Sequence, residues 1–205
     1  MCGGEPNCST TATAGTDSKA KVLLALREGS SNLQFMLSRE IGVMLRMLDA
    51  AGYEVAATSA SGRAMGTGAL QISPELKLAE IRIADFAGLL LPSLAVGLTA
   101  PIPDKLIEIV RKAAAGRIPI AAQHGSVVVL QRAGVLKKKR YAFEHGVFTE
   151  GMYAGTGVVR DGNIITSGTC PYRARHTGRP DGTAALTRLF ILALSGGAPL
   201  PLNRT

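Results

Sequence analysis

Short apolar runs alternate with helical patterns along this chain, and that order constrains the fold more than any other feature. We predict strands at four of the runs, which are Lys21–Leu26, Tyr53–Thr58, Phe86–Leu91 and Ile118–Ala122. Apolar strands that alternate with helices are typical of a mostly parallel sheet covered on both faces. The sequence therefore predicts an α/β domain.

The segments between and after these runs have helical features. Apolar residues at helical spacing predict a helix from Leu33 to Ala51, and Gly52 is the residue type that ends a helix in a left-handed conformation. The remaining predictions are helices over Pro101–Ala115, Ser126–Arg132 and Ala184–Leu194, and a hairpin that turns at Asp161–Gly162.

Length and composition predict one domain. The 205 residues, of which 46% are hydrophobic, are enough for one buried core and few for two. We expect the domain to span residues 20–196, with a flexible arm at 1–19 and a tail at 197–205. The arm is rich in Gly, Ser and Thr and has no apolar signal segment. No window approaches the roughly 18 apolar residues of a membrane span, so no membrane partner is expected.

Cysteine usage and net charge indicate which cellular compartment and which partners to expect. Cys2, Cys8 and Cys170 form neither a disulfide framework nor a C-x-x-C pair, which favours a reducing cytoplasm. The net charge is +8, but the dense basic run Lys137–Arg140 follows an expected helix end, where cations are ordinary. Aromatic residues make up 4% of the chain and none interleaves with that run. We therefore expect no nucleic-acid partner and favour a small anionic ligand.

One turn is shaped for a functional site. The strand ending at Ala122 runs through Gln123-His124-Gly125-Ser126 into a helix. Ligands of open α/β sheets bind outside the carboxyl ends of the strands. A tight strand–turn–helix connection also aims one side chain into that crevice, beside the free N–H groups of the helix.

Four segments together resemble the ThiJ/PfpI (DJ-one) family of the class I glutamine amidotransferase-like superfamily. Arg117–Ser126, followed by Ala133-Gly-Val-Leu136, resembles the family stretch "kpvaAICHGp…l..aGvL". Val158–Ser167 resembles "VVvDGNlITs", Ala51–Val55 resembles "AGyeV", and Ala84–Pro92 resembles "DyDalvlPGG". The segments occur in the family's order over roughly Lys21 to Leu194. The resemblance implies a flavodoxin-like three-layer α/β/α sandwich and a homodimer.

The chain departs from the family at the tight turn between the strand ending at Ala122 and the helix that follows, which we call the elbow. An ungapped comparison places His124 where the family has its nucleophilic cysteine, and a one-residue gap places Gln123 there instead. Neither residue is a thiol. The family's "PGG" reads Pro92-Ser93-Leu94, so Ser93 replaces a glycine of the oxyanion site. The acidic residue of the family's first helix corresponds to Glu40, for which a solvated helix carboxylate is the alternative.

Roles for these residues follow from the resemblance. Beside Glu40, a neutral His124 would act as a general base, or as a ligand-binding group if catalysis has been lost. We expect the two side chains within hydrogen-bond reach of each other, directly or through one water. Gly125 and Ser126 would line the site. Ser126 is better explained as a helix cap than as a nucleophile.

The connection from Thr169 to Pro180 is longer than the family's short "rgP". In the family this connection passes close to the elbow, which would bring a thiol and several cations to the site. The residues concerned are Cys170, Arg173, Arg175, His176 and Arg179. A solvated loop with surface arginines is the alternative. His145 is most simply a helix-surface residue, and three scattered histidines predict no metal site.

Two functions remain open. The first is a non-catalytic domain that binds or responds to a small anionic or carbonyl compound. The second is an intracellular amidase-, protease- or glyoxalase-like enzyme that uses His124 and Glu40. The missing cysteine favours the first, and neither requires a cofactor.

Overall fold

The computed structural model describes residues 19–29, 33–67, 70–93 and 101–196. The expected arm, apart from its last residue, and the expected tail lie outside these ranges. In the part of the chain that is described, no helix is long and apolar enough to cross a membrane.

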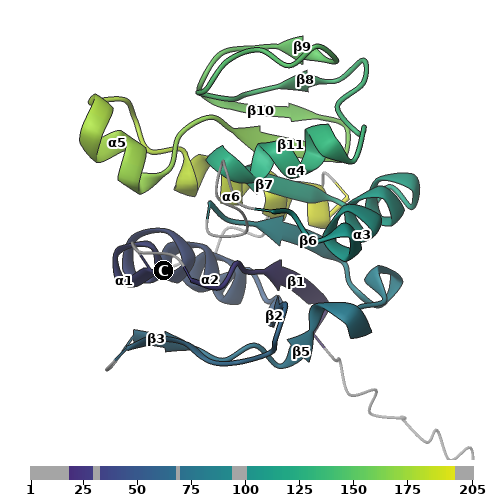
Figure 1. Cartoon of the computed structure of the whole chain (residues 1–205), viewed down its shortest axis with the longest axis vertical. Helices are drawn as coiled ribbons and strands as arrows, with labels where there is room; N and C mark the ends of the chain where they lie inside the picture. The colour runs from purple at the N-terminus through teal and green to yellow at the C-terminus, as the bar shows by residue number, and fades with distance from the viewer. Residues whose placement is uncertain (1–18, 30–32, 68–69, 94–100, 197–205) are drawn as a thin grey trace, which may run out of the picture.

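A seven-stranded sheet forms the centre of the fold, in the order β10-β11-β7-β6-β1-β2-β5 (Figure 1). Every neighbouring pair in it is parallel except β10 with β11, which form an antiparallel hairpin. The strands are β1 (Lys21–Ala25), β2 (Glu54–Ser59), β5 (Leu76–Lys77), β6 (Gly88–Leu91), β7 (Ile120–Gln123), β10 (Val158–Asp161) and β11 (Ile164–Ser167). The predicted mostly parallel sheet is confirmed.

Alternate residues of the buried strands face two separate hydrophobic cores. Leu23, Leu89 and Ile120 pack with the helices of one face, while Leu24 and Leu90 pack with those of the other. Strands that are covered on both faces must be apolar at nearly every position, and this is why the sequence shows continuous apolar runs there.

Two helices cover the first face and three helical elements cover the second. The first face carries α3 (Asp104–Ala115) and α4 (Val127–Arg132), and the second carries α1 (Leu33–Met36), α2 (Gly42–Ala50) and α6 (Thr183–Leu194). A π-helical turn, η1 (Leu37–Ile41), joins α1 to α2, so the predicted helix over 33–51 is present with a widened turn inside it. The three-layer α/β/α architecture is confirmed.

Several short elements were not predicted. The strands β3 (Met65–Thr67) and β4 (Leu70–Ile72) pair with each other, as do β8 (Arg140–Tyr141) and β9 (Met152–Tyr153). A helix, α5 (Pro171–Thr177), occupies most of the connection expected as a loop. In Figure 1, β8, β9 and β10 lie at one end of the molecule and α5 projects from its side.

Candidate functional site at the end of strand β7

His124 forms the tight turn between β7 and the following helix. Its φ angle is +48°, in the left-handed region that side chains rarely adopt. Gln123, by contrast, ends the strand with φ −108° and is fully buried. Its amide nitrogen donates to the Thr169 carbonyl at 3.0 Å and to the Thr183 hydroxyl at 2.8 Å. The elbow residue is therefore His124, and the gapped alternative with Gln123 is wrong.

The imidazole of His124 pairs with that of His145. The two Nε2 atoms are 2.7 Å apart, and the rings meet edge to face with centroids 4.8 Å apart. His145 lies in a bend after β8 rather than on a helix, so the helix-surface interpretation is wrong. The His124 side chain is 13% exposed and that of His145 is 31% exposed, so solvent reaches the pair.

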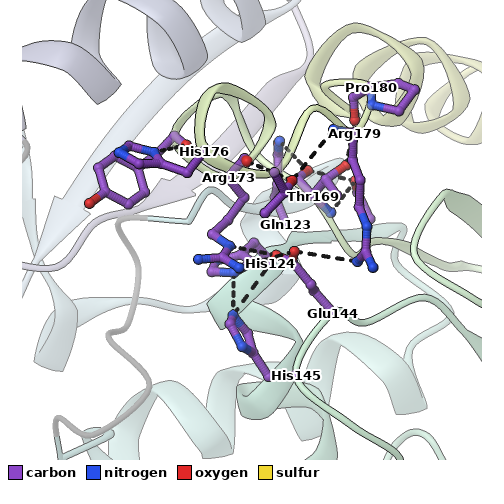
Figure 2. A network of polar contacts seen from close by, with 12 residues as sticks. Gln123, His124, Glu144, His145, Thr169, Arg173, His176, Arg179 and Pro180 are labelled. Atoms are coloured by element: carbon purple, nitrogen blue, oxygen red, sulfur yellow. Dashed lines mark hydrogen bonds and ion pairs between the residues drawn. The ribbon is translucent and has the colours of Figure 1, made fainter.

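Glu144 is the carboxylate nearest to this pair. Its Oε2 lies 3.6 Å from Nε2 of His124 and 4.0 Å from Nε2 of His145. The side chain is only 5% exposed, and it is neutralised by two guanidinium groups. Arg173 donates to both of its oxygens, at 2.7 and 3.2 Å, and Arg179 donates to Oε1 at 3.4 Å. Figure 2 shows the carboxylate between these arginines and the two imidazoles.

The surroundings hold both imidazole and carboxylate in defined charge states. Burial is the main cause that lowers the pKa of His124 to about 4, and the neighbouring His145 adds to the effect. Burial alone would raise the pKa of Glu144. However, the hydrogen bond and the charge of Arg173 outweigh it and keep the pKa below its ordinary value. Near neutral pH, His124 is therefore neutral and Glu144 is ionised.

An aromatic cluster fixes the segment that carries Glu144 and His145. Phe143 stacks on Phe148 with centroids 4.7 Å apart, and Phe148 stacks on Tyr141 at 5.1 Å. The Tyr141 hydroxyl accepts the Phe148 N–H at 2.8 Å. The His145 ring packs edge to face on Phe143 at 5.7 Å. The position of His145 beside the elbow is thus set by packing on its own segment.

Glu40 lies in a second polar cluster and is fully buried, so the solvated-carboxylate alternative is wrong. The Ser93 N–H donates to its Oε1 at 2.8 Å, and the Ser93 hydroxyl donates to its Oε2. Among the described residues, Glu40 makes no direct hydrogen bond to His124, and Ser93 donates to both of its oxygens instead. Burial raises the pKa of Glu40 to about 7.

Cys170 adjoins this second cluster. The thiol is buried, and burial followed by the nearby Glu40 carboxylate raises its pKa to about 11. A thiol with such a pKa stays protonated near neutrality, and only the thiolate is a strong nucleophile. The Cys170 thiol thus lies beside Glu40 and Ser93 and is unreactive near neutral pH.

The remaining predicted residues divide between site and surface. The Ser126 hydroxyl donates to the Pro92 carbonyl at 2.5 Å and makes no capping bond, so its interpretation as a helix cap is wrong. Gly125 is buried in the turn beside it. On α5, only Arg173 contacts the group formed by His124, Glu144 and His145, which we call the elbow cluster. The Arg175 guanidinium lies 5.9 Å over the Phe35 ring, and Nδ1 of His176 donates to the Tyr172 carbonyl.

Sequence reasoning missed Glu144 entirely and misplaced His145. A usable signal was present, because Glu-His directly follows an apolar stretch that ends in Phe143, and chemically active residues often follow a strand end. Their convergence on His124 could not be inferred, because β8 was not predicted.

Comparison with known proteins shows to which family the chain is related. The model of the DJ-1/PfpI family matches residues 20–175. Among solved structures, DJ-1beta from Drosophila melanogaster has 24% identity and a TM-score of 0.63, over 87% of this chain and 92% of that one. A DJ-1 superfamily protein from Agrobacterium tumefaciens has 15% identity and a TM-score of 0.64, over 88% and 92%.

A third structure, oxidised DJ-1 from Toxoplasma gondii, has 18% identity and a TM-score of 0.58, over 85% of this chain and 88% of that one. The search of curated proteins returned no significant match. Structural similarity at such low sequence identity shows the fold alone. Family membership is shown by the family model, which matches more than half of the chain. The chain belongs to the DJ-1/PfpI family.

Proposed function

We propose that this protein binds a small molecule with a carboxylate or phosphate group at the His124 elbow, without the thiolate chemistry that the family resemblance implies. The observation that carries the proposal is the convergence of Arg173 and Arg179 on one carboxylate beside a neutral imidazole. Two cations and one anion leave a net positive charge next to the elbow.

The arginines retain donors for a ligand. A guanidinium has five N–H donors, and Glu144 takes two hydrogen bonds from Arg173 and one from Arg179. Fork-shaped donors of this kind match the oxygens of carboxylates and phosphates. A cavity of about 250 Å³ adjoins Arg179 and is also lined by Thr169 and Asp181, whereas His124 and Arg173 do not line it, so it offers space beside Arg179 and not at the elbow itself.

Hydrolysis by a His124–Glu40 pair has less support. With a pKa of about 4, His124 is a weak base at neutral pH. Glu40 is hydrogen-bonded to Ser93 and so does not orient the imidazole. A neutral His124 suits hydrogen bonding to a ligand oxygen better than proton abstraction.

Helix α5 offers a matched pair of variants to test the proposal. Arg173 contacts Glu144, whereas Arg175, two residues later, packs over Phe35. We expect small carboxylates and phosphates to raise the unfolding temperature of the wild type and of R175A, because ligands that bind only the folded state stabilise it. The same compounds should give no shift in R173A.

Each shift is measured against the ligand-free unfolding temperature of the same variant, because R173A also removes a hydrogen bond from a buried carboxylate. If neutral amides and alcohols stabilise the wild type as much as anions do, the proposal is wrong. Equal anion shifts in R173A and R175A would also contradict it.

We further propose that the protein forms a homodimer, which sedimentation at several concentrations would test.

A further inference from the structure

Three side chains at the elbow present atoms of the kind that bind transition metals. The two Nε2 atoms of His124 and His145 and a carboxylate oxygen of Glu144 all lie within 4.8 Å of one another. We propose that these three side chains form a binding site for Zn²⁺ or a similar late first-row transition-metal ion. This inference does not depend on the anionic ligand proposed above.

The distances are close to those that such an ion requires. Zinc–nitrogen and zinc–oxygen bonds of about 2.0–2.2 Å place two ligand atoms roughly 3.3 Å apart at a tetrahedral angle. The distances from Glu144 Oε2 to the two Nε2 atoms, 3.6 and 4.0 Å, are slightly longer. The 2.7 Å separation of the two Nε2 atoms is shorter, so the rings must part by about half an ångström. Small side-chain rotations supply this change.

Donor chemistry favours this class of ion over magnesium or calcium. Two imidazoles and one carboxylate suit zinc, copper and nickel, whereas magnesium and calcium prefer oxygen ligands.

The surroundings orient the ligands in advance. Arg173 donates to both oxygens of Glu144 and Arg179 donates to Oε1, which fixes the carboxylate, and Oε2 also faces the two imidazoles. The stacked ring of Phe143 supports His145 from behind. Outer contacts of this kind hold ligands in place in known metal sites.

The same arginines set limits on the site. Two guanidinium charges close to a dication weaken its binding, but they favour an anion as the fourth ligand. Three protein ligands leave that position open, as in catalytic rather than structural zinc sites. We therefore expect moderate affinity and a metal that carries an exchangeable anion.

Zinc binding is tested by calorimetric titration of the tag-free protein, in which Cys2 and Cys8 are replaced by serine to remove accessible thiols. The chain has three histidines, and the third provides the control because His176 lies on α5 and bonds Tyr172. We expect one zinc ion per chain in the parent protein and in H176A. H145A should lose at least about tenfold in affinity.

Cobalt titration gives a second readout, because the visible absorption of Co²⁺ reports tetrahedral nitrogen and oxygen ligation. The band should appear in the parent and in H176A and be absent in H145A. Ligand-free unfolding temperatures of the variants separate loss of a ligand from loss of fold. Zinc binding to H145A as strong as to the parent would overturn the proposal, as would a parent protein that binds no zinc.

Discussion

Glu40 illustrates how a buried residue departs from its ordinary chemistry. Its carboxyl is surrounded by Ser93, the Cys170 thiol and, at longer range, the Asp181 carboxylate. Ser93 supplies two hydrogen bonds, which favour the ionised form, but burial outweighs them and the pKa rises to about 7. A carboxylic acid that is half protonated at neutral pH makes stability depend on pH.

The sign of that dependence follows from proton binding. Between pH 4.5, the ordinary pKa, and pH 7, the folded chain holds the Glu40 proton more tightly than the unfolded chain does. The free energy of unfolding therefore falls as pH rises through this window, by up to about 3 kcal/mol from this residue. E40Q is neutral at every pH and lacks this contribution.

Urea unfolding at pH 4.5 and at pH 8 tests this prediction. The free energy of unfolding of E40Q relative to the wild type should increase from the lower to the higher pH. Asp181 is present in both proteins, so its own titration largely cancels in the difference. A difference that is the same at both pH values would show that Glu40 ionises as an exposed carboxyl does.

Cys170 is expected to be chemically silent in the native protein. A buried thiol with a pKa of about 11 reacts slowly with alkylating agents. Iodoacetamide should leave Cys170 unmodified in native protein and modify it in urea, as peptide mass spectrometry would show. Any consumption of methylglyoxal should be the same before and after alkylation. In a variant with Cys2 and Cys8 replaced by serine, activity that iodoacetamide abolishes would contradict this prediction and point to Cys170 as the nucleophile.

At the scale of elements, the π turn η1 carries Glu40 into the core and depends on a glycine that ends it. The Gly42 N–H donates to the Leu37 carbonyl across the widened turn. A Cβ atom at position 42 would stand 2.9 Å from that same carbonyl oxygen, closer than real contacts allow. Only glycine fits there without a shift of the backbone.

We expect G42A to destabilise the protein by about 1–3 kcal/mol, because the backbone must move to relieve the clash. The control is G116A. Gly116 has an ordinary φ of −77°, and a Cβ there would meet its nearest neighbour at 3.3 Å. Chemical denaturation of both variants measures the difference. Equal stability of G42A and G116A would show that the π turn relaxes to a regular helix at no cost.

Elements with strong local signals could be predicted from the sequence. The β10–β11 hairpin follows from Asp161–Gly162, and Gly162 indeed has φ +64°. Helix α5 could not be predicted, because its seven residues carry three charged or histidine side chains and no apolar period. Pro171 at its start and Gly178 at its end were the local signs, and both residue types are equally common in loops.

The candidate site was predicted only in part, for a similar reason. His124 follows from the strand–turn–helix pattern, which is local. Its partners come from two other segments, one that carries Glu144 and His145 and one that carries Arg173. Such convergence depends on strand order, and the sequence did not reveal β8 or the course of the chain after it.

At the scale of the whole molecule, the sheet brings two polar clusters close together at the carboxyl ends of its strands. The elbow cluster follows β7, and the Glu40–Ser93 cluster follows β6, its parallel neighbour. Helix α5 connects them, because Cys170 adjoins Glu40 and Arg173 contacts Glu144. At the centre of this arrangement, His124 occupies the elbow and is paired with His145.

Nitrogen-15 NMR of the imidazoles tests that claim most directly, because the chain has only three histidines. An Nε2-to-Nε2 hydrogen bond requires a proton on Nε2 of one ring and a free lone pair on Nε2 of the other, which is then protonated at Nδ1. Once H176A has identified the third ring, we predict one resonance set of each tautomer for His124 and His145, and a change in the His124 set in H145A. Two Nε2–H tautomers, with His124 resonances unchanged in H145A, would contradict the account.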